Sequence, residues 1–256
     1  MDCKRAQLQA RILALAGSTE AGRRRVVLPL DLPAIDRTLP GGGLLRGALH
    51  EIAGHDTVIG NTPAARNDAD GAATGFAAAL LARFALNGPV AWIVASGNLY
   101  APGLLALGLD PARLLIVEAA NRRMALWAFE ECLRTRRLAA ALAELDRLAL
   151  VESRRLQLAA ETHGVTALLL RSFGAGKTTA KAEASVARTR WRVAALASRA
   201  SEGVGAPCWR VTLAHCRGGL PGEWTVEQRA KTWRVVDDDV AAHAAVAPPD
   251  ARALVG

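Results

Sequence analysis

Two stretches of this 256-residue chain carry residue types that bind phosphate groups. The first is a glycine turn at residues 41–43, which leads into an apolar strand at residues 48–53 and a polar connection at residues 54–71. A helix follows this connection. A strand, a loop and a helix in that order begin a nucleotide-binding unit, because the N–H groups at the start of the helix can hold phosphate. The second stretch is GAGKTT at residues 174–179, which combines a lysine with hydroxyl groups.

The first stretch lacks the lysine of a phosphate-binding loop. In the pattern GxxxxGK[ST] the lysine contacts the terminal phosphates and the hydroxyl holds Mg²⁺. No lysine lies between Lys4 and Lys177. The connection also contains Asp56, Asp68 and Asp70, whose charges would repel a triphosphate. The sequence therefore predicts the backbone arrangement of an ATP site without the lysine that binds the phosphates, and no cofactor is expected.

The second stretch fails the spacing of the same pattern. The position five residues before Gly176 requires glycine, but Arg171 occupies it. We interpret the stretch as a basic loop that follows a strand. Its candidate nucleic-acid-binding residues are Arg171, Lys177, Lys181 and Arg188, with Arg190 beside them. An ordinary solvated loop is the alternative interpretation.

The net charge of +8 and the pI of 10.1 favour an anionic partner, which in an α/β protein of this kind is most often nucleic acid. A merely solvated basic surface in a chain rich in arginine and alanine is the alternative. The N-terminus lacks the apolar segment of a signal peptide, and no apolar run approaches the ~20 residues that span a bilayer. We therefore expect a cytoplasmic protein without membrane contact and with reduced cysteines.

Metal binding is not expected from the spacing of the possible ligands. The four cysteines are scattered along the chain, and His50 and His55 miss the i, i+4 spacing of a metalloprotease pair.

The strand that ends near residue 145 carries Glu144 and Asp146 at its end. Trp92, in an earlier apolar strand, is expected to be a core residue.

Hydrophobic periodicity predicts the elements that position these residues. Helices are expected at residues 4–16, 75–86, 99–107, 122–137 and 147–162. Strands are expected at residues 48–53, 89–95, 113–118, 138–145, 165–170, 189–197, 208–216, 223–226 and 232–236. Three prolines at positions 29, 33 and 40 predict an extended connection rather than a helix. The alternation predicts an α/β fold whose mostly parallel sheet is flanked by helices, with late antiparallel strands added at one edge.

This order of elements resembles the core of the RecA recombinases. Residues 40–54 (PGGGLLRGALHEIAG) are similar to the turn and strand that lead into the RecA phosphate loop. In the strand that ends WIVAS, Ser96 stands where RecA has its catalytic glutamate, and a serine cannot act as that base. The segment around residues 173–186 resembles a DNA-contacting loop of RecA, which favours a DNA loop over an ATP loop.

Several short sequence motifs, which occur in the same order along the chain, resemble those of the ImuA family, the RecA-like accessory proteins of bacterial mutagenesis. They are LPAID at 32–36, LYAPGL at 99–104, GLDPA at 108–112 and RRLQLAAE at 154–161. The resemblance implies a non-catalytic accessory protein of damage-induced translesion synthesis and the SOS response. Its implied partners are an ImuB-like inactive relative of Y-family polymerases, an error-prone replicative-type polymerase and DNA. It also implies that the helix at residues 4–16 can mediate self-association.

The resemblance covers residues 26–236 and divides the chain into three parts. Residues 1–38 form an N-terminal helix and basic connection, residues 39–236 form the RecA-like core, and residues 237–256 are expected to be a disordered tail. Two other functions stay open. One is a DNA-dependent ATPase with an atypical pocket built from Asn61, Thr62 and Arg66, or using Lys177. The other is a DNA-binding protein that acts alone.

Overall fold

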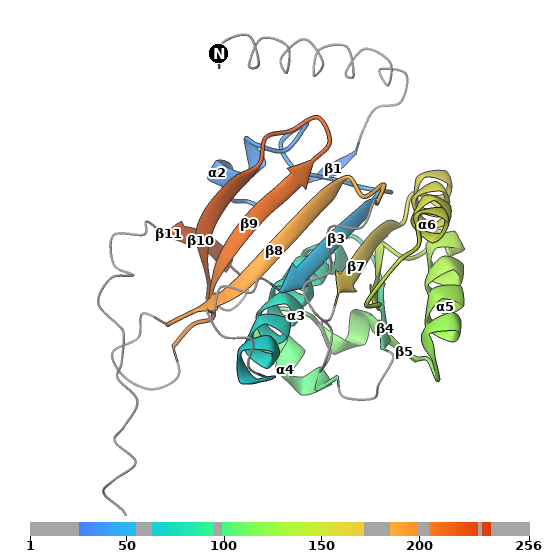
Figure 1. The fold of residues 1–256 in the computed structure, drawn as a ribbon, viewed down its shortest axis with the longest axis horizontal. Coiled ribbons are helices and arrows are strands. Elements are labelled where there is room, and N and C mark those ends of the chain that lie inside the picture. Colours follow the sequence, from blue (N-terminus) through green and yellow to red (C-terminus); the bar gives the residue numbers. More distant parts are fainter. Residues whose placement is uncertain are drawn as a thin grey trace, which may run out of the picture.

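A nine-stranded sheet forms the centre of the protein (Figure 1). The structure, a computed structural model, describes residues 26–54, 63–94, 99–171, 185–198, 205–229 and 232–236, with side chains in the helix that begins at residue 63 described from residue 70. The strands are β3 (Leu49–Gly54), β4 (Val90–Val94), β5 (Leu114–Glu118), β6 (Ala140–Glu144), β7 (Thr166–Arg171), β8 (Thr189–Leu196), β9 (Cys208–Cys216), β10 (Gly222–Arg229) and β11 (Thr232–Val236). Their order is β11-β10-β9-β8-β3-β7-β6-β4-β5.

The expected α/β class is confirmed, with one refinement of where the antiparallel part begins. Strands β5, β4, β6, β7 and β3 are parallel neighbours, as the alternation of strands and helices requires. Strand β8 is the first of the late strands, and it pairs with β3 in parallel. The antiparallel ladder starts only at β9 and continues through β10 and β11. The late strands therefore extend the sheet from its parallel centre.

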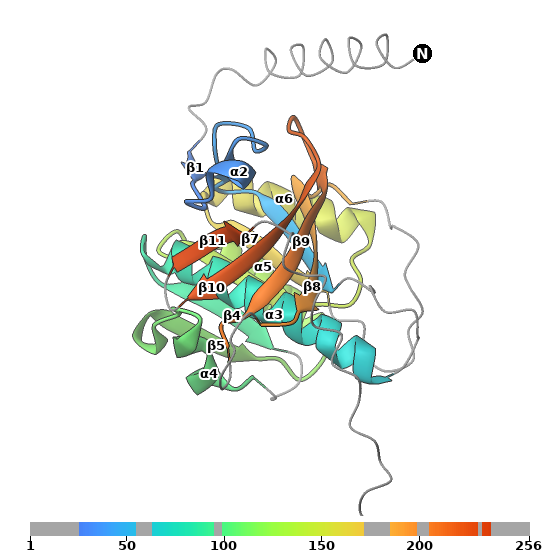
Figure 2. The ribbon, with the colours of Figure 1, turned by 90° about the vertical axis from the view of Figure 1, so that its left-hand side faces the viewer.

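Helices cover the two faces of the sheet unequally (Figure 2). Helix α3 (Pro63–Ala85) packs on one face against β3, β8, β6, β7 and β4. Helix α5 (Arg122–Arg134) lies over β6 and β4 on the other face, and α6 (Leu150–His163) lies beside it over β3 and β7. The short helix α4 (Ala101–Ala106) and the 3₁₀ turn Pro111–Arg113 connect β4 to β5. No helix of the described residues is long and apolar enough to cross a bilayer.

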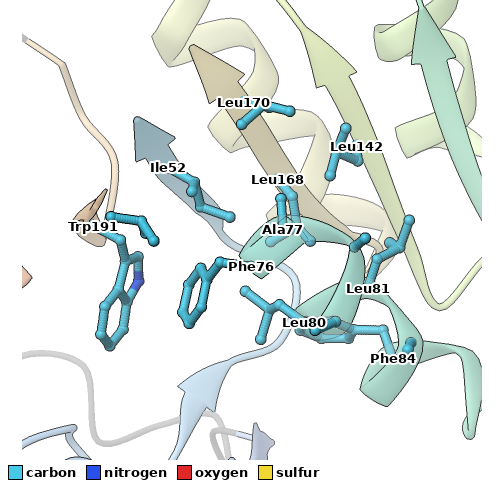
Figure 3. Packing of buried hydrophobic residues seen from close by; sticks show 14 of the residues in the cluster. Ile52, Phe76, Ala77, Leu80, Leu81, Phe84, Leu142, Leu168, Leu170 and Trp191 are labelled. Atoms are coloured by element: carbon cyan, nitrogen blue, oxygen red, sulfur yellow. The ribbon is translucent and has the colours of Figure 1, made fainter. Parts of the chain in front are cut away.

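The largest hydrophobic core lies between α3 and the sheet (Figure 3). Phe76, Leu80 and Leu81 of α3 point toward Ile52 of β3 and Leu168 of β7, and all five side chains are fully buried. The ring of Phe76 also meets three tryptophans, with centroids 6.0 Å from Trp191, 6.0 Å from Trp209 and 5.3 Å from Trp233. Helix α3 therefore joins the parallel core to the antiparallel extension.

Two expectations about local structure are wrong. Helix α3 begins at Pro63, not after the polar connection, because proline suits the first helical position and the alanines that follow favour helix. The stretch with three prolines contains α2 (Pro33–Asp36), with Pro33 again at the helix start. The Asp36 carboxylate accepts hydrogen bonds from the N–H groups of Leu30 and Leu32, which closes this turn.

The glycine turn joins two short strands that the sequence did not reveal. Strand β1 (Val27–Leu28) pairs antiparallel with β2 (Leu44–Leu45). A Cβ at Gly43 would lie 2.5 Å from the carbonyl oxygen of Leu28, so this pairing requires glycine at that position. The predicted helix at residues 4–16 and the predicted tail at residues 237–256 lie outside the described residues.

Candidate functional site

The carboxyl edge of the parallel strands is the first candidate site. Strands β3, β4, β6, β7 and β8 all end at this edge, and open α/β sheets bind ligands beyond the carboxyl ends of their strands. The connections after β3, β4 and β7 contain many of the residues expected to act here. Asn61, Thr62, Ser96, Lys177 and Lys181 lie outside the described residues, and Arg66 lies in α3 with its side chain outside the description.

Glu144 is a carboxylate at this edge whose contacts the structure shows. It is the last residue of β6, and its Oε1 accepts a hydrogen bond of 2.8 Å from Nε1 of Trp92 on the neighbouring strand β4. Burial raises the pKa of the Glu144 carboxyl, and the hydrogen bond from Trp92 partly opposes this shift. Trp92 is a core residue, as expected, but its bond to Glu144 was not foreseen. A half-buried acid with a raised pKa at a strand end is a candidate proton donor or acceptor.

Arg171, one of the predicted nucleic-acid-binding residues, lies at the base of the predicted basic loop. It ends β7, its side chain is only 13 % exposed, and its Nε donates to the carbonyl oxygen of Asp146 at 3.3 Å. Its Nη1 lies 3.9 Å from the carboxylate of Glu51, a buried residue in the middle of β3. The guanidinium group of Arg171 therefore contributes to the structure of the protein through its contact with the Glu51 carboxylate.

Glu51 also meets both ends of the connection that contains the predicted basic loop. The hydroxyl of Ser185, the first described residue after residues 172–184, donates to Oε1 of Glu51. Nε of Arg190 lies 3.6 Å from Oε2 of Glu51, and Nη2 of Arg190 donates to the carbonyl oxygen of Ser185 at 3.2 Å. One buried carboxylate thus holds Arg171 before the connection and Ser185 after it. We infer that Glu51 fixes the distance between Arg171 and Ser185, the residues on either side of this connection.

His50, on the opposite face of β3, is part of a series of hydrogen bonds that runs from Trp191 through Thr189 and His50 to Leu45. Nε1 of Trp191 can only donate, and it donates to Oγ1 of Thr189 at 2.7 Å. The Thr189 hydroxyl lies 2.8 Å from Nδ1 of His50, and Nε2 of His50 lies 2.9 Å from the carbonyl oxygen of Leu45. Nε2 must carry the proton, and Nδ1 accepts from Thr189. Burial lowers the pKa of His50 to about 4, so the ring is a neutral structural group.

Arg188 lies apart from Arg171, beside a small cavity at the amino end of β8. The cavity measures about 20 Å³, which is room for about one water molecule, and His50, Thr189 and Cys216 also line it. The backbone N–H of Arg188 donates to the carbonyl oxygen of Leu49 at 2.8 Å. Arg171 and Arg188 therefore mark different ends of the sheet and do not form one cluster.

The described residues contain no group of three or more side chains that could hold a metal ion. Within them Cys132, Cys208 and Cys216 are free thiols, and burial raises the pKa of Cys216 to about 11. A raised pKa lowers the thiolate fraction, so Cys216 is a poor nucleophile.

Sequence reasoning missed the roles of Glu51 and Glu144. An acidic residue inside an otherwise apolar strand was the available signal for both.

Comparison with known proteins identifies relatives that match most of the chain. No protein-family model matches the chain. The chain is 38 % identical over 220 residues to Protein ImuA of Caulobacter vibrioides strain NA1000, and equally similar to Protein ImuA of strain ATCC 19089 of the same species. The match covers 81 % of this chain and 86 % of each relative. This level of identity over most of both chains establishes that the protein belongs to the ImuA family.

Proposed function

We propose that this protein is a non-catalytic accessory factor of damage-induced, error-prone translesion synthesis. Membership of the ImuA family supports a role in DNA-damage mutagenesis. In this proposal the protein acts by contact with an ImuB-like inactive relative of Y-family polymerases, and through it with an error-prone replicative-type polymerase. Contact with DNA is a second part of the proposal, and the net charge of +8 supports it.

The observation that carries the non-catalytic part is the composition of the connection from β3 to α3. Residues 55–62 are the only residues between the two elements, and they contain Asp56 but no lysine. A phosphate-binding loop at this position needs a lysine for the terminal phosphates.

A nucleotide titration tests the non-catalytic proposal. We expect no saturable binding of ATP and Mg²⁺ up to millimolar concentration, measured by calorimetry with the full chain. Saturable binding at micromolar ATP that the substitution Lys177→Ala abolishes would contradict the proposal, because it would show that the GAGKTT stretch supplies the missing lysine.

A DNA-dependent ATPase is the second candidate function, and Glu144 is the observation that favours it. Its raised pKa and its position at the end of β6 suit a residue that handles a proton or a metal-bound water. If the protein hydrolyses ATP, Glu144→Gln should reduce the rate by at least about 100-fold. Glu118→Gln, at the end of the edge strand β5, is the matched control and should leave the rate unchanged.

Co-purification tests the partner part of the proposal. The full chain, co-expressed with the ImuB-like protein of its native host, should form a complex that survives gel filtration. A protein that binds DNA in a salt-sensitive manner but forms no such complex is a DNA-binding protein that acts alone. Removal of the predicted helix at residues 4–16 tests self-association, which we propose to depend on that helix.

Charge reversal tests the predicted DNA loop. The substitutions Lys177→Glu and Lys181→Glu should weaken binding to single-stranded DNA and should lower the dependence of the binding constant on salt by about 0.7 per lost phosphate contact. Unchanged affinity and an unchanged salt slope would remove these lysines from the DNA-binding surface.

A further inference from the structure

The strand register places arginines from several strands on one face of the sheet. Residues directly opposite each other in a ladder point to the same face. Arg171 of β7 is opposite Ala53 of β3, and Ala53 is opposite Arg192 of β8. Arg192 is in turn opposite Thr212 of β9. Trp191 and Val193 point to the opposite face, into the core under α3.

The same face continues across β9, β10 and β11. Thr225 is opposite Arg210, and Glu227 is opposite Arg234. We define the arginine face by its six guanidinium groups: Arg171, Arg190, Arg192, Arg210, Arg229 and Arg234. The carboxylates on it are Glu51, Glu223 and Glu227, so the described part of this face has twice as many arginines as acids.

The described helices leave the outer part of this face uncovered. Helix α3 packs against the opposite face of β8, and α5 and α6 lie over β4, β6, β7 and β3. Figure 1 shows the broad surfaces of β8, β9 and β10 toward the reader, with no helix in front of them. The side chains of Arg210, Arg229 and Arg234 are 35 %, 64 % and 53 % exposed. These guanidinium groups are accessible to a partner.

The acids on the face do not neutralise its positive charge. Glu227 is shared between Arg229 and Arg234. Arg210 lies 3.8 Å from the half-exposed Glu223, a solvent-exposed pair that contributes little. His215 lies opposite Arg190 on β9, and its pKa is lowered first by burial and then by the charges of Arg190 and Arg217, while Glu51 opposes this shift.

Four of the six arginines follow one oblique track, and Arg190 and Arg229 lie beside it on β8 and β10. Arg171 and Arg192 share a row of the sheet, Arg210 lies one row further along on β9, and Arg234 lies one row beyond it on β11. With strands about 4.8 Å apart and about 3.4 Å per residue along them, the oblique track from β7 to β11 is about 28 Å long. Contacts on both strands of a duplex would require two rows of cations, separated by a groove about 12 Å wide. A single track suits a single strand.

We propose that the arginine face binds the sugar–phosphate backbone of single-stranded DNA, with Arg192 and Arg210 as the central phosphate contacts. This inference rests on the proposed contact of the protein with DNA and names the surface that makes it. Planar guanidinium groups bind phosphate oxygens in bidentate geometry. Among the described residues no Phe, Tyr or Trp is exposed on this face, and the exposed His215 is the one ring that it offers, so binding should depend little on sequence.

The test is the salt dependence of binding to a fluorescein-labelled oligothymidine of twenty nucleotides, measured by anisotropy with the full chain. The double variant Arg192→Gln/Arg210→Gln should lower the slope of log K against log salt by about 1.4, which is two phosphate contacts on single-stranded DNA. Its affinity at 0.1 M salt should fall by about one order of magnitude. Arg192→Lys/Arg210→Lys keeps both charges and should keep most of the slope.

The matched control is Arg136→Gln/Arg154→Gln, which removes the same charge from exposed positions after α5 and on α6. An equal loss of slope in this control would overturn the proposal, because net charge alone would then explain the effect. Wild-type slope and affinity in Arg192→Gln/Arg210→Gln, with losses in Lys177→Glu/Lys181→Glu, would overturn the proposal but leave the DNA contact in place. A wild-type chain without salt-dependent binding would overturn both. Circular dichroism melting confirms that each variant is folded.

Discussion

His50, Glu51 and Ile52 are consecutive residues of β3, all buried, and each contributes in a different way. Ile52 packs under α3, His50 closes a hydrogen-bond chain, and Glu51 holds the two ends of a connection. Polar side chains in a central strand are costly unless every group is paired. His50 and Glu51 each have their own hydrogen-bond or charged partners, so a substitution at either position that removes these partners' contacts should destabilise the protein.

The lowered pKa of His50 predicts a pH-dependent loss of stability. Its pKa is about 4 in the folded chain and 6.5 in the unfolded chain, so the unfolded chain binds the proton first as the pH falls. The stabilisation is fully present above pH 6.5, is lost between pH 6.5 and about 4, and amounts to about 3 kcal/mol. His50→Gln should flatten the pH dependence of the free energy of unfolding in this window, measured by urea denaturation.

The control for this prediction is Leu86→Gln, just after α3, whose side chain is 79 % exposed and which introduces no titratable group. This variant should retain the wild-type slope. A His50→Gln chain whose stability still falls as steeply as that of the wild type between pH 6.5 and 5 would show that other groups carry the effect.

Glu51 predicts a contrast between a buried and an exposed carboxylate. Glu51→Gln removes the Glu51 charge from beside the largely buried Arg171 and Arg190, which should cost about 3 kcal/mol in the free energy of unfolding. Glu223→Gln removes a carboxylate at a comparable distance, 3.8 Å, from Arg210, but at a half-exposed position. This control should change stability by less than about 0.5 kcal/mol. Similar costs for both substitutions, by chemical denaturation, would contradict the buried role of Glu51.

At the scale of elements, α3 connects the two parts of the sheet. Phe76 is fully buried and meets Trp191 of β8, Trp209 of β9 and Trp233 of β11. Phe76→Ala should destabilise the protein by about 4 kcal/mol, because it opens a cavity among these rings. Tryptophan fluorescence reports the unfolding transition and the altered ring environment in one measurement.

Leu86→Ala, just after α3, is the control because this side chain is 79 % exposed. Its cost should stay below about 0.5 kcal/mol. If Phe76→Ala cost no more than this control, α3 would not be the connection between the parallel core and the antiparallel extension.

At the scale of the whole molecule, the described fold ends with β11. Trp233 of this strand packs against Phe76 and lies under the guanidinium group of Arg83, 5.5 Å from the ring centroid. Deletion of residues 237–256, which the sequence predicts to be a disordered tail, should change the free energy of unfolding by less than about 0.5 kcal/mol. Deletion of residues 230–256 removes Trp233 as well and should cost more than about 3 kcal/mol. Thermal melting of the two truncated chains compares them.

The spacing of apolar residues determined the kind and order of the elements. Strands β4 and β7 are nearly continuous apolar runs, as expected for a parallel sheet buried on both faces, and the helices α5 and α6 show helical periodicity. The start of α3 was misplaced because a polar composition suggested a loop, whereas alanine propensity and Pro63 favoured helix. Local patterns thus specified the elements better than their ends.

The sequence by itself determined the α/β class, the absence of a lysine after β3 and the excess of positive charge, because composition and periodicity carry these properties. Only the tertiary structure decided that Trp92 bonds Glu144, that Glu51 meets Arg171 and Ser185, and that arginines of separate strands share one face. The physical reason is register: pairing between strands far apart in the chain decides which side chains meet, and a shift of one residue would turn each to the opposite face.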